Sequence, residues 1–394
     1  MVPEVGMDEI AFRRNDDNVI VPQGQPGQPL QATAASPAAN DPYPWILHPV
    51  IDLLFACGGL FWIIFGVFLV SGVKPDLFGG PTAFTMMAVA IIGLHLLGDP
   101  HQPATLYRVY FSAPTRKALG KPVAIWGLIA LAAALSTFFI HSTSVFWVKL
   151  VVAWGLQHQL SQSYGIALVY CFKRKVKLSQ TEKLIMAGMI NATITYLMLR
   201  MFTLEPYGHM LAPGGLELPL WNFIPEPVTQ VGLYCMQLSI LVFAGMVVRK
   251  YVKEKVLFPF PALLTLTTLV IMPFLAGTNF IFVWVWFSTT FFHSSQYLVV
   301  TSAYYFKEKG LPENVSLWQI SKMLKTLDFA KYFAIIFSVG FFVSYLLPNF
   351  LADHGASKAL AFSSIWVFVN LHHFATDSFI WKLRDPALQK LIIS

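Results

Sequence analysis

Ten histidines occur in this chain of 394 residues, and several of them are followed four positions later by a carboxylate. Residues four apart lie on the same face of a helix, so each such pair presents an imidazole and a carboxylate in one direction. Together these groups suit iron, and also zinc, manganese or copper. The spacing occurs three times, in His48–Asp52, His95–Asp99 and His373–Asp377.

Other histidines extend this set. His101 follows the second pair, His158 has Gln162 at the same four-residue offset, His293 opens HSSQY, and His372 precedes His373. Imidazoles on several helices outnumber the three or four ligands of one zinc ion, so two metal ions are an option. The predicted metal ligands are His48, Asp52, His95, His101, His158, His293, His372, His373 and Asp377.

Ligating imidazoles need hydrogen-bond acceptors behind them, and nearby polar residues supply candidates for this supporting role: Asp99, Gln162, Tyr164, Gln296 and Tyr297. Each residue also has an ordinary structural reading. A single histidine in a membrane helix is more often a hydrogen-bond partner of a neighbouring helix than a ligand. Asp99 stands before Pro100, and we expect that pair to end a helix. His48 stands before Pro49, which is typical of a helix start.

The elements that position these residues are predicted to be membrane helices. Hydrophobic residues make up 56% of the chain and charged residues 12%, about half of the roughly 25% usual in soluble domains. The net charge of +7 is spread in short clusters between apolar runs, which does not indicate a nucleic-acid partner. The three cysteines lie singly in apolar runs, so neither a disulfide framework nor a thiolate metal site is expected.

A membrane-spanning helix needs about 20 mostly apolar residues. About ten runs qualify, at 48–72, 82–99, 122–142, 145–171, 182–202, 229–249, 257–276, 279–306, 329–347 and 359–383. Loops rich in lysine and arginine alternate with poor ones along the chain, so the positive-inside rule places both termini in the cytoplasm. The expected class is an all-α, polytopic helix bundle in the cell membrane.

Three regions follow from this topology. Residues 1–44 are rich in Pro, Gln, Gly and Ala and are predicted to be a disordered cytoplasmic tail. Residues 45–386 form the transmembrane helical domain, and 387–394 a short cytoplasmic C-terminus. Seven of the histidines then fall at the cytoplasmic end or in the cytoplasmic half of five helices: His48, His95, His101, His158, His293, His372 and His373.

This array of histidines and acids resembles the sites of integral-membrane non-haem diiron enzymes. That class includes fatty acid desaturases, alkane and sterol hydroxylases, and carotenoid hydroxylases and ketolases. The resemblance is one of site design over about seven residues, since the chain has one HH pair, His372–His373, and no HxxHH. It implies a metal-dependent oxidoreductase with iron as cofactor, a cytoplasmic electron donor, and a lipid-like, apolar substrate that enters from the bilayer.

Two other functions stay open. Ionisable residues inside membrane helices also mark proton or ion relays, which would make the chain a proton- or ion-coupled transporter. Alternatively, His158 and His293, at equal depth, would hold haem as paired axial ligands in an electron-transfer subunit. Bound metal without porphyrin absorbance favours the oxidoreductase, a porphyrin band favours the haem protein, and flux without metal favours the transporter.

Overall fold

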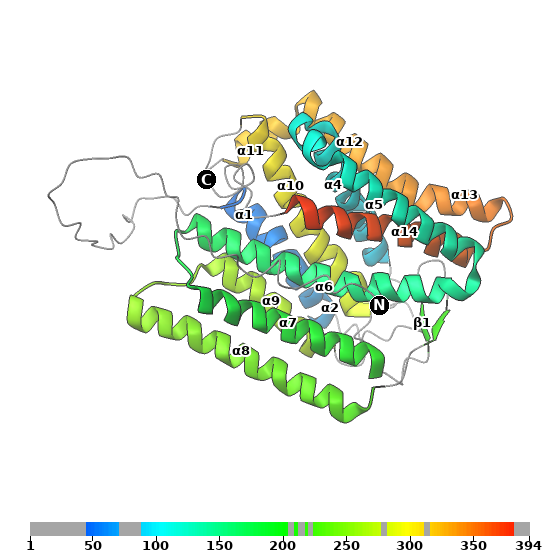
Figure 1. Cartoon of the computed structure of the whole chain (residues 1–394). Coiled ribbons are helices and arrows are strands. Elements are labelled where there is room, and N and C mark those ends of the chain that lie inside the picture. The colour runs from blue at the N-terminus through cyan, green and yellow to red at the C-terminus, as the bar shows by residue number, and fades with distance from the viewer. Residues whose placement is uncertain are drawn as a thin grey trace. The chain divides into compact units, whose positions relative to one another are not determined.

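The structure is a computed structural model, and it describes residues 45–70, 88–203, 209–211, 217–219, 224–276, 282–310 and 316–381. All of these residues belong to one compact unit, Tyr43–Ser394. Apart from a short antiparallel pair of strands, the described residues form helices and their connections (Figure 1). The predicted helical class is therefore confirmed, whereas the segments 1–44 and 387–394 lie outside the described residues.

Regular α-helices alternate with wider π-helical segments, which carry the letter η. The first half of the chain contains α1 (Pro49–Ile51), η2 (Asp52–Ala56), α2 (Gly59–Val70), η3 (Leu94–Gly98), α4 (Asp99–Phe111), α5 (Ala113–Phe139), α6 (His141–Lys173) and α7 (Gln180–Thr203). The strands β1 (His209–Leu211) and β2 (Glu217–Pro219) follow. The second half contains α8 (Glu226–Glu254), α9 (Phe260–Ala276), η6 (Phe282–Ser294), α10 (Ser295–Glu308), α11 (Leu317–Leu324), α12 (Leu327–Phe341), η7 (Phe342–Leu346), α13 (Leu347–Asp353) and α14 (Lys358–Ile380).

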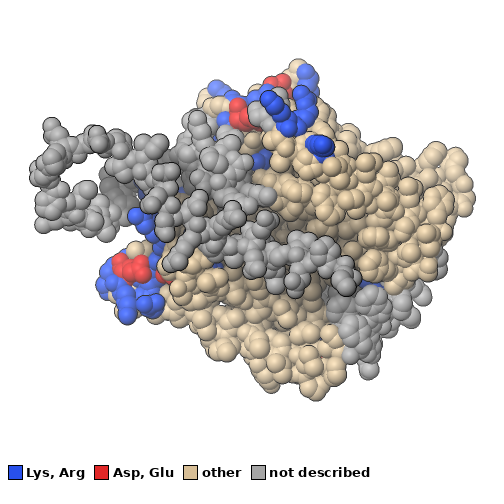
Figure 2. All heavy atoms as spheres, viewed as in Figure 1, with Lys and Arg blue, Asp and Glu red and all other residues tan. Residues whose placement is uncertain are grey.

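Among the described residues, three helical segments are long and apolar enough to cross a membrane: Thr115–Phe139, Glu226–Glu254 and Leu327–Asp353. Only 17% to 28% of their most apolar stretches is buried inside the protein, so most of these apolar side chains face outward. Lipid solvates such surfaces, whereas water does not. In the view of Figure 2, charged side chains gather in two regions and most of the remaining described surface is uncharged. The chain is accordingly described as a membrane protein.

The first predicted span, 48–72, is divided rather than continuous. Pro49–Ala56 and Gly59–Val67 meet at an angle of 60°, and the break falls at Gly58, whose φ is +91°. A Cβ at this position would lie 2.7 Å from Thr268 Cγ2 and 2.9 Å from a ring carbon of Phe292. Only glycine combines this backbone conformation with so close an approach, so the chain turns here against α9 and η6.

The expectation that Asp99–Pro100 ends the second span is wrong. The helix passes through η3 and continues as α4 to Phe111. Pro100 lies in the first turn of α4, where a proline is tolerated because its missing N–H is not needed for the first intrahelical bonds. The continuation buries His101 and Thr105, which a loop would have left near the surface.

Four segments, α4, α6, η6 and α14, meet around the candidate site. Helix α14 packs against α5 and α6, α4 packs against α10, α12 and α14, and η6 contacts η3 and α6. Helix α7 packs mainly against α8. The histidine-bearing segments α4, α6, η6 and α14 are thus brought together. The apolar α5 packs against α4, α6 and α14, and α12 packs against α4.

One prediction concerns the contact between α4 and α12. A Cβ added at Gly340 would overlap the backbone carbonyl of Asp99, and overpacking of this kind costs about 1–3 kcal/mol. Gly340→Ala should therefore lower the unfolding temperature of the purified protein, although Gly→Ala inside a helix normally stabilises by about 0.5–1 kcal/mol. Gly245→Ala in α8, where a Cβ meets no described atom within 4 Å, is the control and should raise it. Equal unfolding temperatures for the two variants would contradict this packing.

Candidate metal centre

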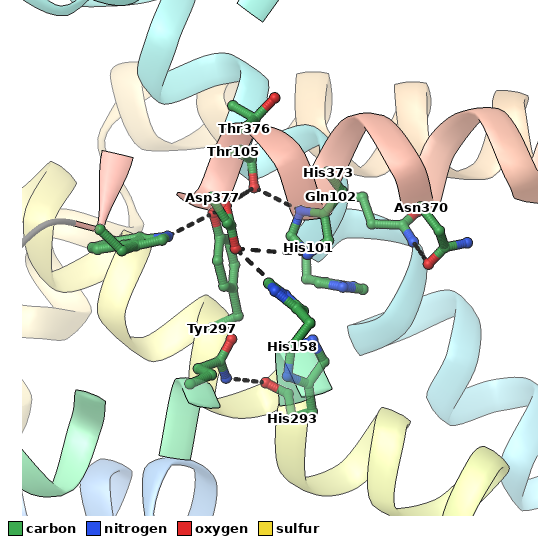
Figure 3. Close-up of polar contacts among 12 residues, drawn as sticks. His101, Gln102, Thr105, His158, His293, Tyr297, Asn370, His373, Thr376 and Asp377 are labelled. Carbon is green, nitrogen blue, oxygen red and sulfur yellow. Dashed lines mark hydrogen bonds and ion pairs between the residues drawn. The ribbon is translucent and has the colours of Figure 1, made fainter. Parts of the chain in front are cut away.

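Four imidazole rings and one carboxylate converge in the interior of the helical bundle (Figure 3). His101 comes from α4, His158 from α6, His293 from η6, and His373 and Asp377 from α14. The ring of His101 lies 4.8 Å from that of His373 and 5.4 Å from that of His293, between centroids. The ring of His158 lies 5.1 Å from that of His293 and 5.0 Å from that of His373. We call these five residues the histidine cluster.

Local helix geometry helps to direct these side chains. His373 and Asp377 are one turn apart on regular α-helix, so they point the same way. His293 lies near the end of the π-helical η6, and His101 lies shortly after the π-helical η3. A π-turn inserts one extra residue and rotates the side chains that follow it, and such turns are frequent at functional sites.

The cluster contains two groupings that could hold a metal ion. In the first, His101, His293 and His373 place one ligand atom each within 4.8 Å of the others; in the second, His158, His373 and Asp377 do the same. His101, His293, His373 and Asp377 are almost fully buried, the side chain of His158 is 11% exposed, and His373 belongs to both groups. Ligand atoms around an ion at about 2.1 Å lie up to about 4.2 Å apart, so only a small contraction is needed.

Four potential ligand atoms of the cluster have no hydrogen-bond partner among the described residues: His158 Nε2, His293 Nδ1, His373 Nε2 and Asp377 Oδ2. Buried polar atoms are normally paired, and an orphaned atom calls for an explanation such as a bound ion. Three of these atoms lie at one place, since Asp377 Oδ2 is 3.6 Å from His158 Nε2 and 3.7 Å from His373 Nε2. A cation at this point would satisfy these three atoms together.

Hydrogen bonds behind the rings orient the free nitrogen of two of them. His373 Nδ1 lies 3.0 Å from Thr105 Oγ1, which in turn donates to Asp377 Oδ1 over 3.1 Å. With its single hydroxyl proton directed to Asp377, Thr105 accepts the Nδ1–H of His373, and the Nε2 lone pair remains for a metal ion. His101 Nδ1 likewise contacts the backbone carbonyl of Gly98, which leaves its Nε2 free.

Asp377 is held by two hydroxyl groups. Tyr297 donates to its Oδ1 over 2.8 Å and also contacts Thr105, while Trp381 Nε1 donates to the Tyr297 hydroxyl over 3.3 Å. These bonds use Oδ1 and leave Oδ2 directed towards His158 and His373. Tyr297, one of the predicted supporting residues, therefore contacts the cluster directly.

Two further predicted supporting residues hold the helices behind the cluster. Gln162 donates to the backbone carbonyl of His293 over 2.9 Å and to the side chain of Gln296 over 3.1 Å. Gln296 in turn donates to the carbonyl of Ala56 over 2.8 Å. These amides connect α6, η6 and η2. Tyr164 instead packs at the margin of the main apolar core.

The remaining predicted ligands belong to neither metal-binding group and have other partners. Asp52 accepts the backbone N–H groups of Ile46, Leu47 and His48 and the hydroxyl of Tyr170. It thus satisfies amides at the start of α1, where His48 caps the amide of Val50.

The second HxxxD pair and His372 are also used elsewhere. His95 Nδ1 and Asp99 Oδ2 lie 2.7 Å apart, so this pair is satisfied internally, and the His95 ring packs against Phe341 and Tyr345. His372 Nε2 lies 3.1 Å from the carbonyl of Val123 on α5.

Three residues around the cluster were missed in the sequence: Thr105, Trp381 and Arg108. The Arg108 guanidinium lies between the rings of Tyr304 and Trp381, 4.1 and 4.2 Å from their centroids, and so holds Trp381 beside Tyr297. Thr105 stands four residues after His101. Had the helix been extended through Pro100, this spacing would have placed Thr105 on the face of His101.

A cavity of about 270 Å³ adjoins the cluster on the side of His158 and Asp377. It lies between α6, α10 and α14, and its walls are mainly apolar. Its lining includes Trp154, Ile166, Val169, Val300, Phe374 and Trp381. Small-molecule sites have this character, with apolar walls and a few placed polar groups.

Thr105→Val tests the support of the cluster. The variant keeps the side-chain shape but removes the hydroxyl that connects His373 and Asp377, so metal affinity should fall by about 10–100-fold, as is usual for groups behind the ligands. Titration of the metal-free protein with Fe²⁺ or Co²⁺ measures this. Thr193→Val on α7, whose hydroxyl bonds only the Met189 carbonyl among the described residues, should leave the affinity unchanged. An unchanged affinity in Thr105→Val would exclude the orienting role.

Comparison with known proteins found no matching family model, no similar curated protein and no similar solved structure. The chemistry of the chain therefore has to be inferred from its own residues.

Proposed function

We propose that this chain is an integral-membrane, metal-dependent oxidoreductase of the oxygenase, hydroxylase or desaturase type. A single observation carries the proposal: the buried, orphaned ligand atoms of His158, His373 and Asp377 meet beside an apolar cavity. Two imidazoles and one carboxylate form the ligand set typical of non-haem Fe(II) oxygenases, in which other positions on the metal remain open. His158 and Asp377 line the cavity, so a substrate there would lie next to the ion.

One ion per chain fits the cluster better than the two that resemblance to diiron enzymes implies. Both metal-binding groups include His373, and its Nδ1 is engaged with Thr105, so Nε2 is its one free ligand atom. A single Nε2 lone pair binds one ion. His158, His373 and Asp377 would hold it, and His101 and His293 would complete or adjust the coordination. When bound, iron would supply the redox chemistry, while Thr105 and Tyr297 fix the protons around it.

The membrane topology is part of the proposal. About ten spans with cytoplasmic termini are supported by the alternation of basic and non-basic loops. Helices α4, α6 and α14 are less apolar than the three clear spans because they carry the cluster and its supporting polar groups. Intramembrane polar residues of this kind normally face the bundle interior. Reducing equivalents would come from a cytoplasmic donor that docks on the basic loops.

The haem alternative is less compatible with the ring packing. Paired axial ligands require a porphyrin between them, whereas the rings of His158 and His293 are in edge contact, at 5.1 Å and 76°. A proton-coupled transporter is supported by the buried Asp377, which faces two imidazoles. The four converging rings, however, are better suited to binding a metal ion than to a carboxylate-based proton relay.

Metal analysis of the detergent-purified protein, together with its absorption spectrum, tests the function. We expect about one iron per chain, no porphyrin band, and an iron–nitrosyl EPR signal when nitric oxide is added to the reduced protein, since an open position is required. The double variant His158→Ala, His293→Ala should lose both the iron and the iron–nitrosyl EPR signal.

The matched control is His48→Ala with His95→Ala, which removes two predicted ligands that belong to neither metal-binding group. This variant should keep both the iron and the nitrosyl signal. A wild-type protein that binds no metal, or that shows porphyrin absorbance, would overturn the oxygenase proposal.

A further inference from the structure

The cavity beside the cluster reaches the outer surface of the bundle between α6 and α14. Its inner end is lined by His158, Tyr297 and Asp377, and its outer end by Gln157 and Ser378, which are both exposed. His158 precedes the end of α6 at Lys173 by about 22 Å along the helix. In the proposed topology Lys173 lies at the cytoplasmic surface, and the apolar core of a bilayer is about 30 Å thick, so an opening at this depth would face acyl chains rather than water.

A polar pair stands at this opening. Gln157 Nε2 donates to Ser161 Oγ over 3.0 Å on the exposed side of α6. A side-chain amide and a hydroxyl have donor and acceptor capacity beyond this one bond. Polar groups exposed at membrane depth are costly unless something pairs with them. They suit a ligand that carries one hydroxyl or carbonyl group.

Gly165 keeps part of the cavity open. It lines the cavity on α6, about two turns after Gln157 and one turn after Ser161. A Cβ added there would meet no described heavy atom within 4 Å. A larger side chain at this position can therefore grow into the cavity without displacing the protein around it.

We propose that the cavity is a lateral entry site for an apolar molecule with a single hydroxyl or carbonyl group, such as a fatty alcohol or aldehyde. The apolar part of the ligand lies along Val169, Val300 and Phe374. Gln157 and Ser161 bind its polar group. Gly165 sets the size of the ligand that the cavity accepts. The inference rests on the proposed function for the reaction that follows binding, but binding itself is measured separately.

Photolabelling of the full-length protein in lipid nanodiscs tests the site. The probe is a long-chain fatty alcohol that carries a diazirine, and labelled peptides are identified by mass spectrometry. We expect labels on the α6 and α10 residues that line the cavity. Gly165→Leu should reduce this labelling about tenfold or more, in the range by which apolar pockets discriminate against misfitting groups, whereas Gly165→Ala should retain it.

Gly188→Leu is the matched control, because Gly188 also lies inside a helix, on α7, with no described heavy atom within 4 Å of an added Cβ. It should label like the wild type. Bound iron is measured in every variant. If Gly165→Leu retains iron and is labelled like the wild type, the entry site is overturned and the metal proposal stands. If the wild type contains no iron, the metal proposal alone is overturned.

Gln157→Leu tests the polar contact without filling the cavity. In this variant, labelling by the alcohol probe should fall to the level that a diazirine alkane of equal length gives. Labelling by the alkane should be the same in the variant and in the wild type. Equal labelling of the wild type by the two probes would contradict recognition of a polar group. Absence of cavity labelling by either probe in the wild type would overturn the entry site itself.

Discussion

His373→Ala should lower the affinity for iron more than about 100-fold. Loss of a group behind a ligand already costs about 10–100-fold, and His373 is a member of both metal-binding groups, so neither remains complete without it. The free Nε2 of this ring faces Asp377 Oδ2 at 3.7 Å. Metal analysis after dialysis against a weak chelator, followed by titration with Fe²⁺ or Co²⁺, measures the loss.

The adjacent residue provides the control. His372→Ala removes an imidazole from the same helix, but this ring contacts the Val123 carbonyl and belongs to neither metal-binding group. We expect His372→Ala to bind iron as tightly as the wild type. A comparable loss in both variants would show that the effect comes from damage to α14 rather than from a missing ligand.

Asp377→Asn should have opposite effects on stability and on metal binding. A buried carboxylate without a cation is costly, because its charge has lost water and has no compensating partner. The amide keeps an oxygen to accept from Tyr297 and Thr105 and gains an N–H₂ group that faces His158 and His373. The metal-free variant should therefore unfold at a higher temperature than the metal-free wild type, while its iron affinity falls about 100-fold.

Thermal unfolding with and without added Fe²⁺ measures both effects. Ligand binding stabilises the folded state by mass action, so iron should raise the unfolding temperature of the wild type and leave that of Asp377→Asn nearly unchanged. Asp99→Asn alters another buried carboxylate at the same spacing from a histidine, but one that is paired with His95. It should keep the response to iron. A full iron response in Asp377→Asn would remove Asp377 from the ligand set.

The five residues of the histidine cluster are all among the nine ligands predicted from the sequence. The HxxxD spacing indicates that two side chains share a helix face, but it does not indicate what lies opposite that face. Asp52 is used by free amides at a helix start, and His95 and Asp99 satisfy each other. Only the His373–Asp377 pair meets Thr105, Tyr297 and His158 from other helices.

The parts that could not be predicted depend on tertiary contacts and on local backbone geometry. At the turn, Thr268 and Phe292, which are distant in the sequence, leave no room for a side chain at Gly58, and Thr268 donates to the Cys57 carbonyl. The passage of a helix through Pro100 follows a π-helical segment whose hydrogen bonding leaves no clear trace in composition or periodicity. Thr105 was missed for this reason, since its role depends on that helical continuation.

X-ray absorption at the iron edge tests the central claim most directly. We predict about one ion per chain, surrounded by nitrogen and oxygen atoms at about 2.0–2.2 Å, the distances of imidazole and carboxylate ligands. Imidazole scattering should diminish in His158→Ala, and no second metal should be seen at about 3.5–4 Å, the separation in two-metal sites. A sulfur ligand, a second metal at that distance, or a spectrum unchanged in His158→Ala would contradict a single ion bound by the histidine cluster.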